Sequence, residues 1–382
     1  MSYSHYKPWL DGSFHKVAAA LAIVGVAPAL GTVDATATAQ TDDQPTCPEC
    51  VIQLDLVTTV GSLDGPDWIP GQPFSIARDS RGRIHMAYPW EGLVPVFDAE
   101  GQPLPPIGRS GEGPGEYQNP YLVRVGRSDT VMVIDASGQL SIVTPSGSYV
   151  RRMRVPVQAV DFLVTDGSGI VFSEQPGIVR AEATEATIFH VFNPVDAVLE
   201  RSFHTLQVEG GGAPPRFRLA SAREPDRFWA IPGNGYEVTQ YTVDGAVTRQ
   251  FTRDPSWMRR PPSKDGIFSP RPGIHGVLEV EGRLWVAGRH ATEDWARYWT
   301  REVFGEDREA TAEELQYSKV YRSVVEVLDI ETGRLITSAS VPGLVLALLP
   351  DRHVATYRED DAGVPYVDVY RITVSEPSND EN

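Results

Sequence analysis

Short apolar segments recur in pairs along the whole chain, each pair joined by a polar turn. The turn holds Asp or Gly and often Arg, and the segments are alternating or nearly continuous in apolar residues. Short apolar runs of this kind, bounded by turn residues, predict β-hairpins. The six copies begin at Ile76, Val123, Leu163, Leu219, Leu278 and Leu346.

A second type of hairpin follows most of these copies. It runs from an apolar strand through a turn that ends in glycine, as in Val96–Gly101 and Ile142–Gly147. Further copies lie at Tyr241–Gly245 and Val327–Gly333, with a weaker one at Val191–Asp196. Two hairpins give four antiparallel strands per unit. Six such units at blade spacing predict an all-β chain that folds as a six-bladed β-propeller.

The last unit is one strand short. The segment Val51–Val57 alternates as a strand does and precedes the first unit. We therefore expect it to pair into the last blade and close the ring, which leaves no long open sheet edge. The propeller then spans residues 51–375, and we expect residues 376–382 to form a disordered polar tail.

One insertion, residues 289–322, breaks the strand pattern of the fifth unit. Its aromatic face follows a 3.6-residue period and consists of Trp295, Tyr298, Trp299 and Val303. A capping box formed by Thr311 and Glu314 predicts a second short helix. The insertion joins the second and third strands of its blade, so we expect it on the face of the loops between blades. It is either a packed surface embellishment or a lid.

The composition narrows the class of partner. The chain has 382 residues and a formal net charge of −17, with 34 Gly and 31 Pro. So many turn residues suit a β fold. Nucleic acid and anionic membranes require a basic surface, so neither is an expected partner. We expect a monomer whose acidic surface keeps it soluble.

The first 39 residues have the pattern of a signal peptide. His15 and Lys16 precede an uncharged, Ala-rich run, Val17–Val33, and Ala37–Ala39 offers a small-residue cleavage site before Gln40. An uncleaved membrane anchor is the alternative, but the run is short and contains a proline. No later segment is apolar enough to span a bilayer. We expect an exported protein, periplasmic or extracellular, without a transmembrane segment after signal removal.

Residues 40–50 form an N-terminal segment that contains both cysteines of the chain, Cys47 and Cys50. A redox-active pair requires a βα context, which does not follow, and a c-type haem requires His where Val51 stands. A structural zinc site requires more ligands. A local disulfide in an oxidising compartment remains, and it would pin the terminus where the chain enters the closing blade.

The glycine-rich run Ile107–Tyr117 lies between two strand-like segments, Val94–Phe97 and Tyr121–Val125. It contains too much glycine and proline for a helix or a ladder strand, so it predicts a shaped loop between two blades. The residues that give this loop its structure are Gly111, Gly113, Pro114, Gly115, Glu116 and Tyr117.

The run Arg109–Tyr117 resembles the hallmark loop of a family of bacterial exported six-bladed β-propellers related to NHL-repeat and TolB-like proteins. Members carry G-R-x-G-x-G-P-G-E-[FY] between the first blades. The cysteine pair ahead of the closing strand and the segment Thr59–Pro66 are similar as well. The resemblance implies a fold and an exported location. It implies no catalytic residue.

Loops between blades usually form the binding face of a propeller, and here they are basic and aromatic on an acidic chain. Such loops suit a small anionic or sugar-like ligand, with an envelope protein as the alternative partner. The acidic members Glu112 and Glu116 could instead pair with arginines and hold the loops. The candidate ligand-binding residues are Arg109, Glu112, Asn119, Arg216, Arg218, Trp257, Arg259, His275, Trp295 and Trp299.

Motifs for catalysis are sparse. The chain has no G-x-S-x-G elbow, and its glycine-rich loop lacks the Lys of a phosphate-binding loop. The cofactor is unknown. Calcium is the one considered, with Asn119 and Asp161 as candidate oxygen ligands. The predicted function is an exported ligand- or protein-binding propeller. The alternative is a calcium-dependent, lactonase-like hydrolase or lyase at the central channel.

Overall fold

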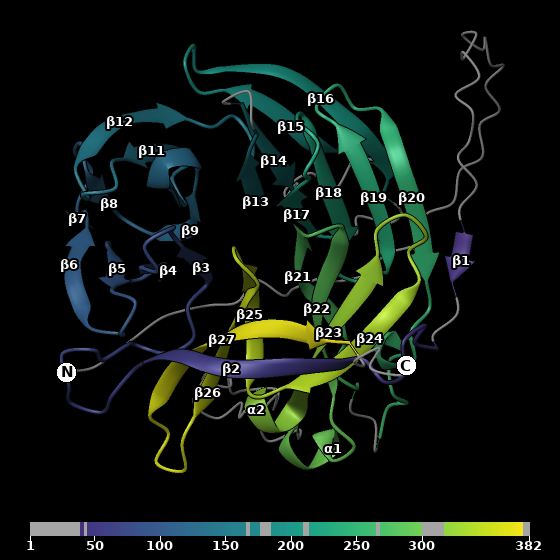
Figure 1. Cartoon of the computed structure of the whole chain (residues 1–382). Helices are drawn as coiled ribbons and strands as arrows, with labels where there is room; N and C mark the ends of the chain where they lie inside the picture. Colours follow the sequence, from purple (N-terminus) through teal and green to yellow (C-terminus); the bar gives the residue numbers. More distant parts are fainter. Residues whose placement is uncertain are drawn as a thin grey trace, which may run out of the picture.

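Six antiparallel sheets surround a common axis in the computed structural model, which describes residues 39–41, 44–165, 169–175, 185–208, 214–264, 268–299 and 317–376. Each sheet is built on four antiparallel strands, to which one sheet adds a fifth, and the six sheets together form a ring (Figure 1). This arrangement confirms the six-bladed β-propeller predicted from the repeated hairpins.

The first three blades follow one another along the chain. Blade one consists of β3 (Ser75–Arg78), β4 (Ile84–Ala87), β5 (Val94–Phe97) and β6 (Pro103–Ile107). Blade two consists of β9 (Pro120–Val125), β10 (Val131–Asp135), β11 (Gln139–Val143) and β12 (Tyr149–Arg154). Blade three consists of β13 (Ala159–Val164), β14 (Ile170–Glu174), β15 (Glu185–Asn193) and β16 (Val198–Gln207).

The other three blades complete the ring. Blade four consists of β17 (Phe217–Ser221), β18 (Arg227–Pro232), β19 (Glu237–Thr242) and β20 (Val247–Arg253). Blade five consists of β21 (Gly273–Val280), β22 (Arg283–Ala291), β23 (Tyr321–Asp329) and β24 (Leu335–Val341). Blade six consists of β25 (Leu344–Leu349), β26 (His353–Glu359), β27 (Pro365–Ser375) and β2 (Val51–Val60).

The first strand of each blade is its inner strand, and each inner strand contacts the inner strands of the two neighbouring blades, so β25 also contacts β3. The main apolar clusters lie between blades, because the faces of neighbouring sheets meet there. One such cluster joins Leu140 of blade two to Phe162 and Phe172 of blade three. Burial of these faces drives the sheets together.

Four of the six inner strands contain a β-bulge near their start. In β21, Ile274 pairs with Gly288 and Gly276 pairs with Ala287, which leaves His275 as the extra residue. A bulge changes the direction of a side chain relative to the regular ladder. The corresponding extra residues of β9, β13 and β25 are Tyr121, Val160 and Leu346.

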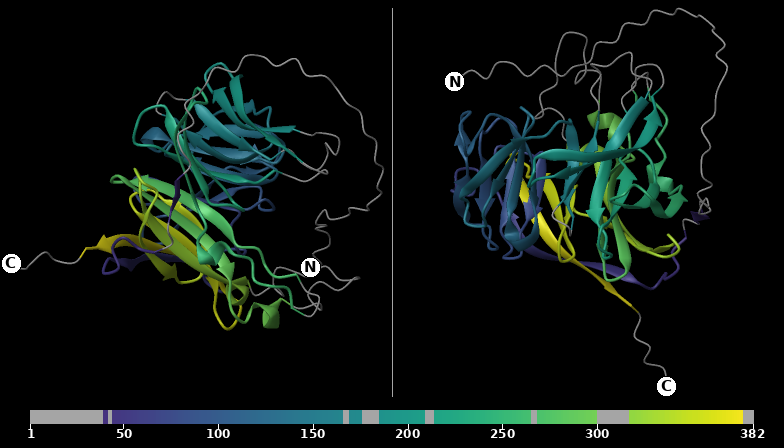
Figure 2. Two further views of the ribbon diagram at one scale, coloured as in Figure 1. Left: turned by 90° about the vertical axis from the view of Figure 1, so that its right-hand side faces the viewer. Right: turned by 90° about the horizontal axis from the view of Figure 1, so that it is seen from above.

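Blade six joins the two ends of the propeller. Its outer strand β2 pairs antiparallel with β27, from Val51 opposite Ser375 to Val60 opposite Val367. Figure 2 shows the purple β2 beside the yellow strands of this blade. The sheet therefore combines segments from opposite ends of the sequence, as the unpaired last unit predicts.

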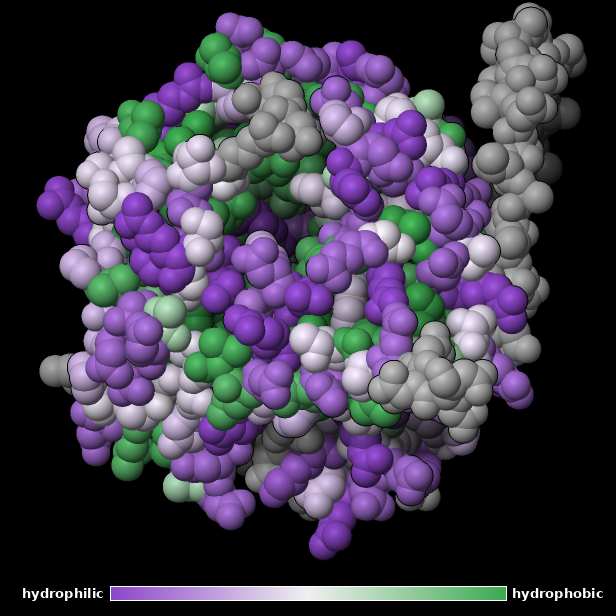
Figure 3. Space-filling model, in the orientation of Figure 1, coloured by the Kyte–Doolittle hydropathy of each residue, from purple (hydrophilic) through white to green (hydrophobic). Residues whose placement is uncertain are grey.

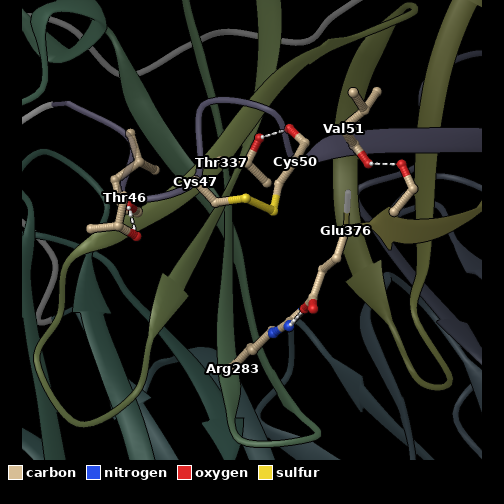
Figure 4. The surroundings of a disulfide bond; sticks show 9 residues. Thr46, Cys47, Cys50, Val51, Arg283, Thr337 and Glu376 are labelled. Atoms are coloured by element: carbon tan, nitrogen blue, oxygen red, sulfur yellow. Dashed lines mark hydrogen bonds and ion pairs between the residues drawn. A yellow bond between two sulfur atoms is a disulfide. The ribbon is translucent and has the colours of Figure 1, made fainter. Parts of the chain in front are cut away.

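A disulfide joins Cys47 to Cys50 just before β2, with the two Cα atoms 5.3 Å apart (Figure 4). This confirms the predicted local disulfide. The segment around it is fixed to β24 of blade five, since Thr46 N donates to Leu335 O at 2.7 Å and Thr337 Oγ1 donates to Cys50 O at 2.7 Å. The chain thus contacts blade five before it enters blade six.

Two features differ from the sequence-based expectation. A short strand, β1 (Ala39–Thr41), pairs parallel with β20 and adds a fifth strand to the sheet of blade four. In the insertion, α1 (Trp295–Tyr298) and α2 (Tyr317–Val320) are single turns in contact with each other. Helix α1 ends before Trp299, whose φ of −114° and ψ of 67° are not helical.

Some predictions fall outside the described residues. These are the signal peptide up to residue 38, the helical positions Val303, Thr311 and Glu314, and the tail from residue 377. Among the described helices, none is long and apolar enough to cross a membrane.

Candidate functional site

The loop Arg109–Tyr117, called the signature loop below, connects blade one to blade two. Its ends form a two-residue parallel pair, β7 (Arg109–Ser110) with β8 (Glu116–Tyr117). Tyr117 is completely buried, and a Cβ on Gly108 would clash with its ring. Gly111 has a φ of 150° and lies against the Glu116 side chain. The glycines therefore allow the tight backbone path that the sequence suggests.

Glu116 fixes the shape of the signature loop. Its Oε1 accepts a hydrogen bond from Arg109 Nε at 2.8 Å, and its Oε2 accepts one from Gly113 N at 2.9 Å. The Gly113 N–H and then the Arg109 guanidinium lower the pKa of Glu116. Arg109 itself remains 79% exposed in its side chain. This ion pair shapes the loop and leaves one side of the guanidinium open to solvent.

A polar pocket of about 390 Å³ lies beside the signature loop on blade two. Glu112 Oε1 accepts a hydrogen bond from Gln118 Nε2 at 2.6 Å, and Arg152 Nη1 donates to Glu112 O at 3.0 Å. Ser137 and Gln139 complete its lining. The pocket is open and rich in hydrogen-bonding groups, so it could hold a polar ligand such as a sugar.

Asp135 holds the exit of the signature loop. Its Oδ2 accepts hydrogen bonds from Gln118 N at 2.7 Å and Asn119 N at 2.9 Å. Burial opposes the charge, but hydrogen bonds from Ser137, Asn119 and Gln118 lower the pKa of Asp135. With its amide oriented to satisfy both neighbours, Asn119 donates to Pro89 O and Gln118 O. Asn119 therefore anchors the exit of the signature loop.

The inner strands enclose a central hollow, which Figure 3 shows surrounded by hydrophilic residues. Asp161 on β13 connects three blades there. It forms an ion pair with Arg124 of β9, and its Oδ2 accepts a hydrogen bond from Leu219 N of β17 at 3.1 Å. Arg124 Nη1 also donates to Ser75 Oγ of β3 at 2.8 Å. These contacts use the side chain of Asp161 within the fold.

Two predicted ligand-binding residues, Arg218 of β17 and His275 of β21, lie next in order around the hollow. Burial lowers the pKa of Arg218, an effect that Asp161 opposes. The pKa of His275 lies well below its ordinary value, because of burial first and then the charges of Arg289 and Arg218. His275 is therefore neutral at neutral pH. Arg289 Nε donates to Val345 O of β25 at 2.8 Å, which connects blade five to blade six.

The charge at the hollow favours anions over cations. Among the described residues, the charges of Arg124 and of Asp161 act on Arg218, and the charges of Arg218 and Arg289 act on His275. Calcium prefers several oxygen ligands of negative charge, and this surrounding opposes it. Within the described parts of the chain, no group of three or more His, Cys, Asp or Glu side chains is arranged to hold a metal ion.

The predicted tryptophans pack within the fold. The ring of Trp257 lies against Gly288, where a Cβ would clash with it, and contacts the ring of Tyr236. Trp295 is only 2% exposed. Trp299 meets Tyr321 edge-on, with ring centroids 6.3 Å apart. In the described part of the insertion, the aromatic residues thus attach it to blade five, as a packed embellishment would require.

Two further predicted arginines, Arg216 and Arg259, are exposed and pair with neighbouring side chains. Arg216 Nε donates to Gln175 Oε1 at 2.7 Å, and Arg259 Nη2 donates to Asp254 Oδ2 at 3.1 Å. Only Arg218, His275 and Asp161 of the predicted set therefore gather at the central hollow.

Sequence reasoning missed Arg124 and Arg289, which lie inside repeated hairpins and not in loops. Their place on the first or second strand of a blade could have pointed to them. It also missed three exposed aromatic residues before and within blade one: Trp68, Phe74 and Trp90.

Comparisons with known proteins identify the fold. No protein-family model matches the sequence, and no curated protein does. A DUF4221 family member from Bacteroides vulgatus superposes with a TM-score of 0.58 at 10% identity, over 85% of this chain and 99% of that one. A Bacteroides fragilis protein named "Putative exported protein" superposes with a TM-score of 0.55 at 10% identity, over 87% and 98%.

The chain is thus a six-bladed β-propeller, and it shares this fold with those Bacteroides proteins. An identity of 10% shows the fold alone, so the function rests on the site itself.

Proposed function

We propose that this propeller is an exported binding module that takes a small anionic or sugar-like ligand on the face formed by the loops between blades. The observation that carries the proposal is the convergence of polar side chains from several inner strands on one hollow, where Arg218 has no counter-ion of its own among the residues that the structure describes. Propellers offer such a hollow to ligands because loops and inner strands of every blade meet there.

Export is supported by three independent features. The first 39 residues have the pattern of a signal peptide. Cys47 and Cys50 form a disulfide, which persists in oxidising compartments. One protein with a similar fold is named for export. We therefore assign the folded chain to the periplasm or the extracellular space, without nucleic acid as a partner.

An envelope protein is the second candidate partner. Trp68, Phe74 and Trp90 are 52%, 56% and 58% exposed. Large exposed aromatic residues are enriched in protein interfaces. Affinity capture from detergent-solubilised envelopes would test this alternative, with the Trp90→Ala variant as the comparison.

A ligand panel tests the main proposal. The chain from Gln40 onward is mixed with small organic anions and with mono- and oligosaccharides, and Tm is measured for each mixture. A ligand that binds only the folded state raises Tm, so at least one compound should raise it by about 2 °C or more at saturation. Calorimetric titration then checks the hit. If no compound of either class shifts Tm, the proposed function is wrong.

A further inference from the structure

Arg218, at the central hollow, is a charged residue without a protein partner among the described residues. Its side chain makes no hydrogen bond or ion pair with any residue that the structure describes, and its Nε is buried without a partner. Arg124 of blade two, whose charge also acts on Arg218, is paired with both Ser75 and Asp161. A buried polar group without a partner is rare, because desolvation costs free energy that no bond returns.

Asp161 does not fill this role, although it is the nearest source of negative charge. Its Oδ1 accepts from Arg124 and, at 2.8 Å, from Phe162 N. Its Oδ2 accepts from Leu219 N at 3.1 Å. The carboxylate is thus shared among blades two, three and four, and its charge is balanced by Arg124. A second guanidinium remains uncompensated.

His275 offers a second polar group near Arg218. It is the extra residue of the bulge in β21, so its side chain departs from the regular ladder of the strand. Its imidazole has no hydrogen-bond partner among the described residues. As a neutral ring it carries one N–H donor. Strands β17 and β21 are in contact, and Arg218 acts on the pKa of His275.

We propose that Arg218 and His275 form the seat of a small oxyanion, a carboxylate or a phosphate group of the ligand, inside the ring. The guanidinium supplies a planar pair of donors for two oxygens, and the imidazole supplies a third donor. The charge of Arg289 acts on His275 as well. This inference rests on the proposed function and names the chemical class that the site recognises.

The seat explains why the arginine is left unpaired. A carboxylate supplied by the protein would occupy the guanidinium permanently and repel the ligand. An unpaired arginine costs stability in the empty protein and returns it on binding, which is the common trade between stability and function.

The test is calorimetric titration of the folded chain with acetate, citrate, inorganic phosphate and sulfate, with glucose as a neutral comparator. We expect one oxyanion per chain for at least one of these probes. The comparison of acetate with phosphate shows which group the seat prefers. The Arg218→Gln variant should bind the best probe about tenfold more weakly, as expected for the loss of a charge-assisted hydrogen bond.

The matched control is Arg249→Gln, which removes the same charge from blade four. Arg249 pairs with Glu331 at 2.9 Å, outside the central hollow. Its variant should bind the probe within about twofold of the unmodified chain, since distant surface charges are screened. His275→Phe, which removes only the N–H donor, should weaken binding less than Arg218→Gln does.

Three outcomes would overturn the inference. One is the absence of saturable oxyanion binding up to about 20 mM, an affinity too weak to matter. Another is equal weakening by Arg218→Gln and Arg249→Gln. The third is glucose binding that oxyanions do not affect.

Should Arg218→Gln fail to fold, Arg218→Lys replaces it. This variant keeps the charge but loses the planar pair of donors, and it should still weaken binding. Unchanged binding in a folded Arg218→Lys chain would contradict the proposed geometry.

The two proposals can fail separately. An oxyanion that binds through Arg218, with no hit in the ligand panel, would support the seat and reject the proposed function. Binding of a neutral sugar without binding of any oxyanion would support the proposed function and reject the oxyanion seat.

Discussion

Two arginines of blade four differ in how the protein balances their charge: Arg253 on β20 is buried, and Arg218 on the inner strand β17 is half-buried. Arg253 at the end of β20 donates through Nη1 to Glu326 Oε2 of blade five at 2.6 Å, and Tyr236 OH donates to the same oxygen at 2.5 Å. Its guanidinium also lies over the Tyr236 ring, 5.0 Å from the centroid. Arg218 of β17 has none of these partners. The pKa values of the two arginines are therefore shifted in opposite directions. Burial lowers both, but Tyr236 and Glu326 raise the pKa of Arg253 overall, while that of Arg218 stays lowered.

The difference separates a structural site from a binding site. The Arg253 network joins blades four and five, and its charges are balanced by the protein. At the central hollow, the charge of Arg218 is left for a ligand to balance. Unfolding and titration experiments test this difference between the two arginines.

The largest effect is expected for Glu326→Gln. It leaves the guanidinium of Arg253 buried without its carboxylate, which costs about 3–5 kcal/mol of unfolding free energy. Urea unfolding followed by tryptophan fluorescence measures the loss. The double variant Arg253→Met with Glu326→Leu is the control, because it removes both charges and should recover most of the stability. A small loss for Glu326→Gln alone would contradict the structural role of this pair.

Asp161→Asn comes next, since Asp161 is the carboxylate that balances Arg124. We expect a loss of about 2 kcal/mol, less than at Glu326 because Arg124 keeps some contact with solvent. The measurement is again urea unfolding. Added oxyanion should restore part of this loss by compensating the freed arginines. Restoration by calcium instead of an anion would favour the calcium-dependent alternative.

Arg218→Met should act in the opposite direction. It removes an uncompensated charge and keeps the volume of the aliphatic stem, so the empty protein should gain about 1 kcal/mol. Tm should rise by about 2 °C in the absence of ligand. The matched comparison is Arg253→Met, which should lower Tm. If Arg218→Met also lowers Tm, Arg218 has a structural role that its contacts do not show.

The smallest effect concerns the pH dependence of His275, which faces Arg218 and Arg289. Its folded-state pKa is depressed, so the unfolded chain takes up the proton first as pH falls. Stability is therefore lost below the ordinary pKa of histidine, near 6.5. Arg218→Met removes one of the charges that hold this pKa down, so the pKa should rise. NMR titration of the imidazole measures it, and an unchanged value would show that the two residues are not coupled.

Local sequence predicted the parts of this protein that depend on neighbours in the chain. The hairpins, the tight path of the signature loop and the Cys47–Cys50 bridge all follow from residues a few positions apart. The pairing of β2 with β27 was predicted by counting strands, because a ring with one missing strand has one place to fill. The parallel strand β1 was not predicted, since no pattern marked its three residues.

The site depends on tertiary structure to a much greater extent. Arg124, Asp161, Arg218 and His275 are far apart in sequence and come together only because each lies on an inner strand of the ring. Sequence alone determined the number of blades and the residue types available, through hydrophobic periodicity and turn chemistry. The closed ring decided which arginines pair with a carboxylate, because only the ring sets the distances between charges on different blades.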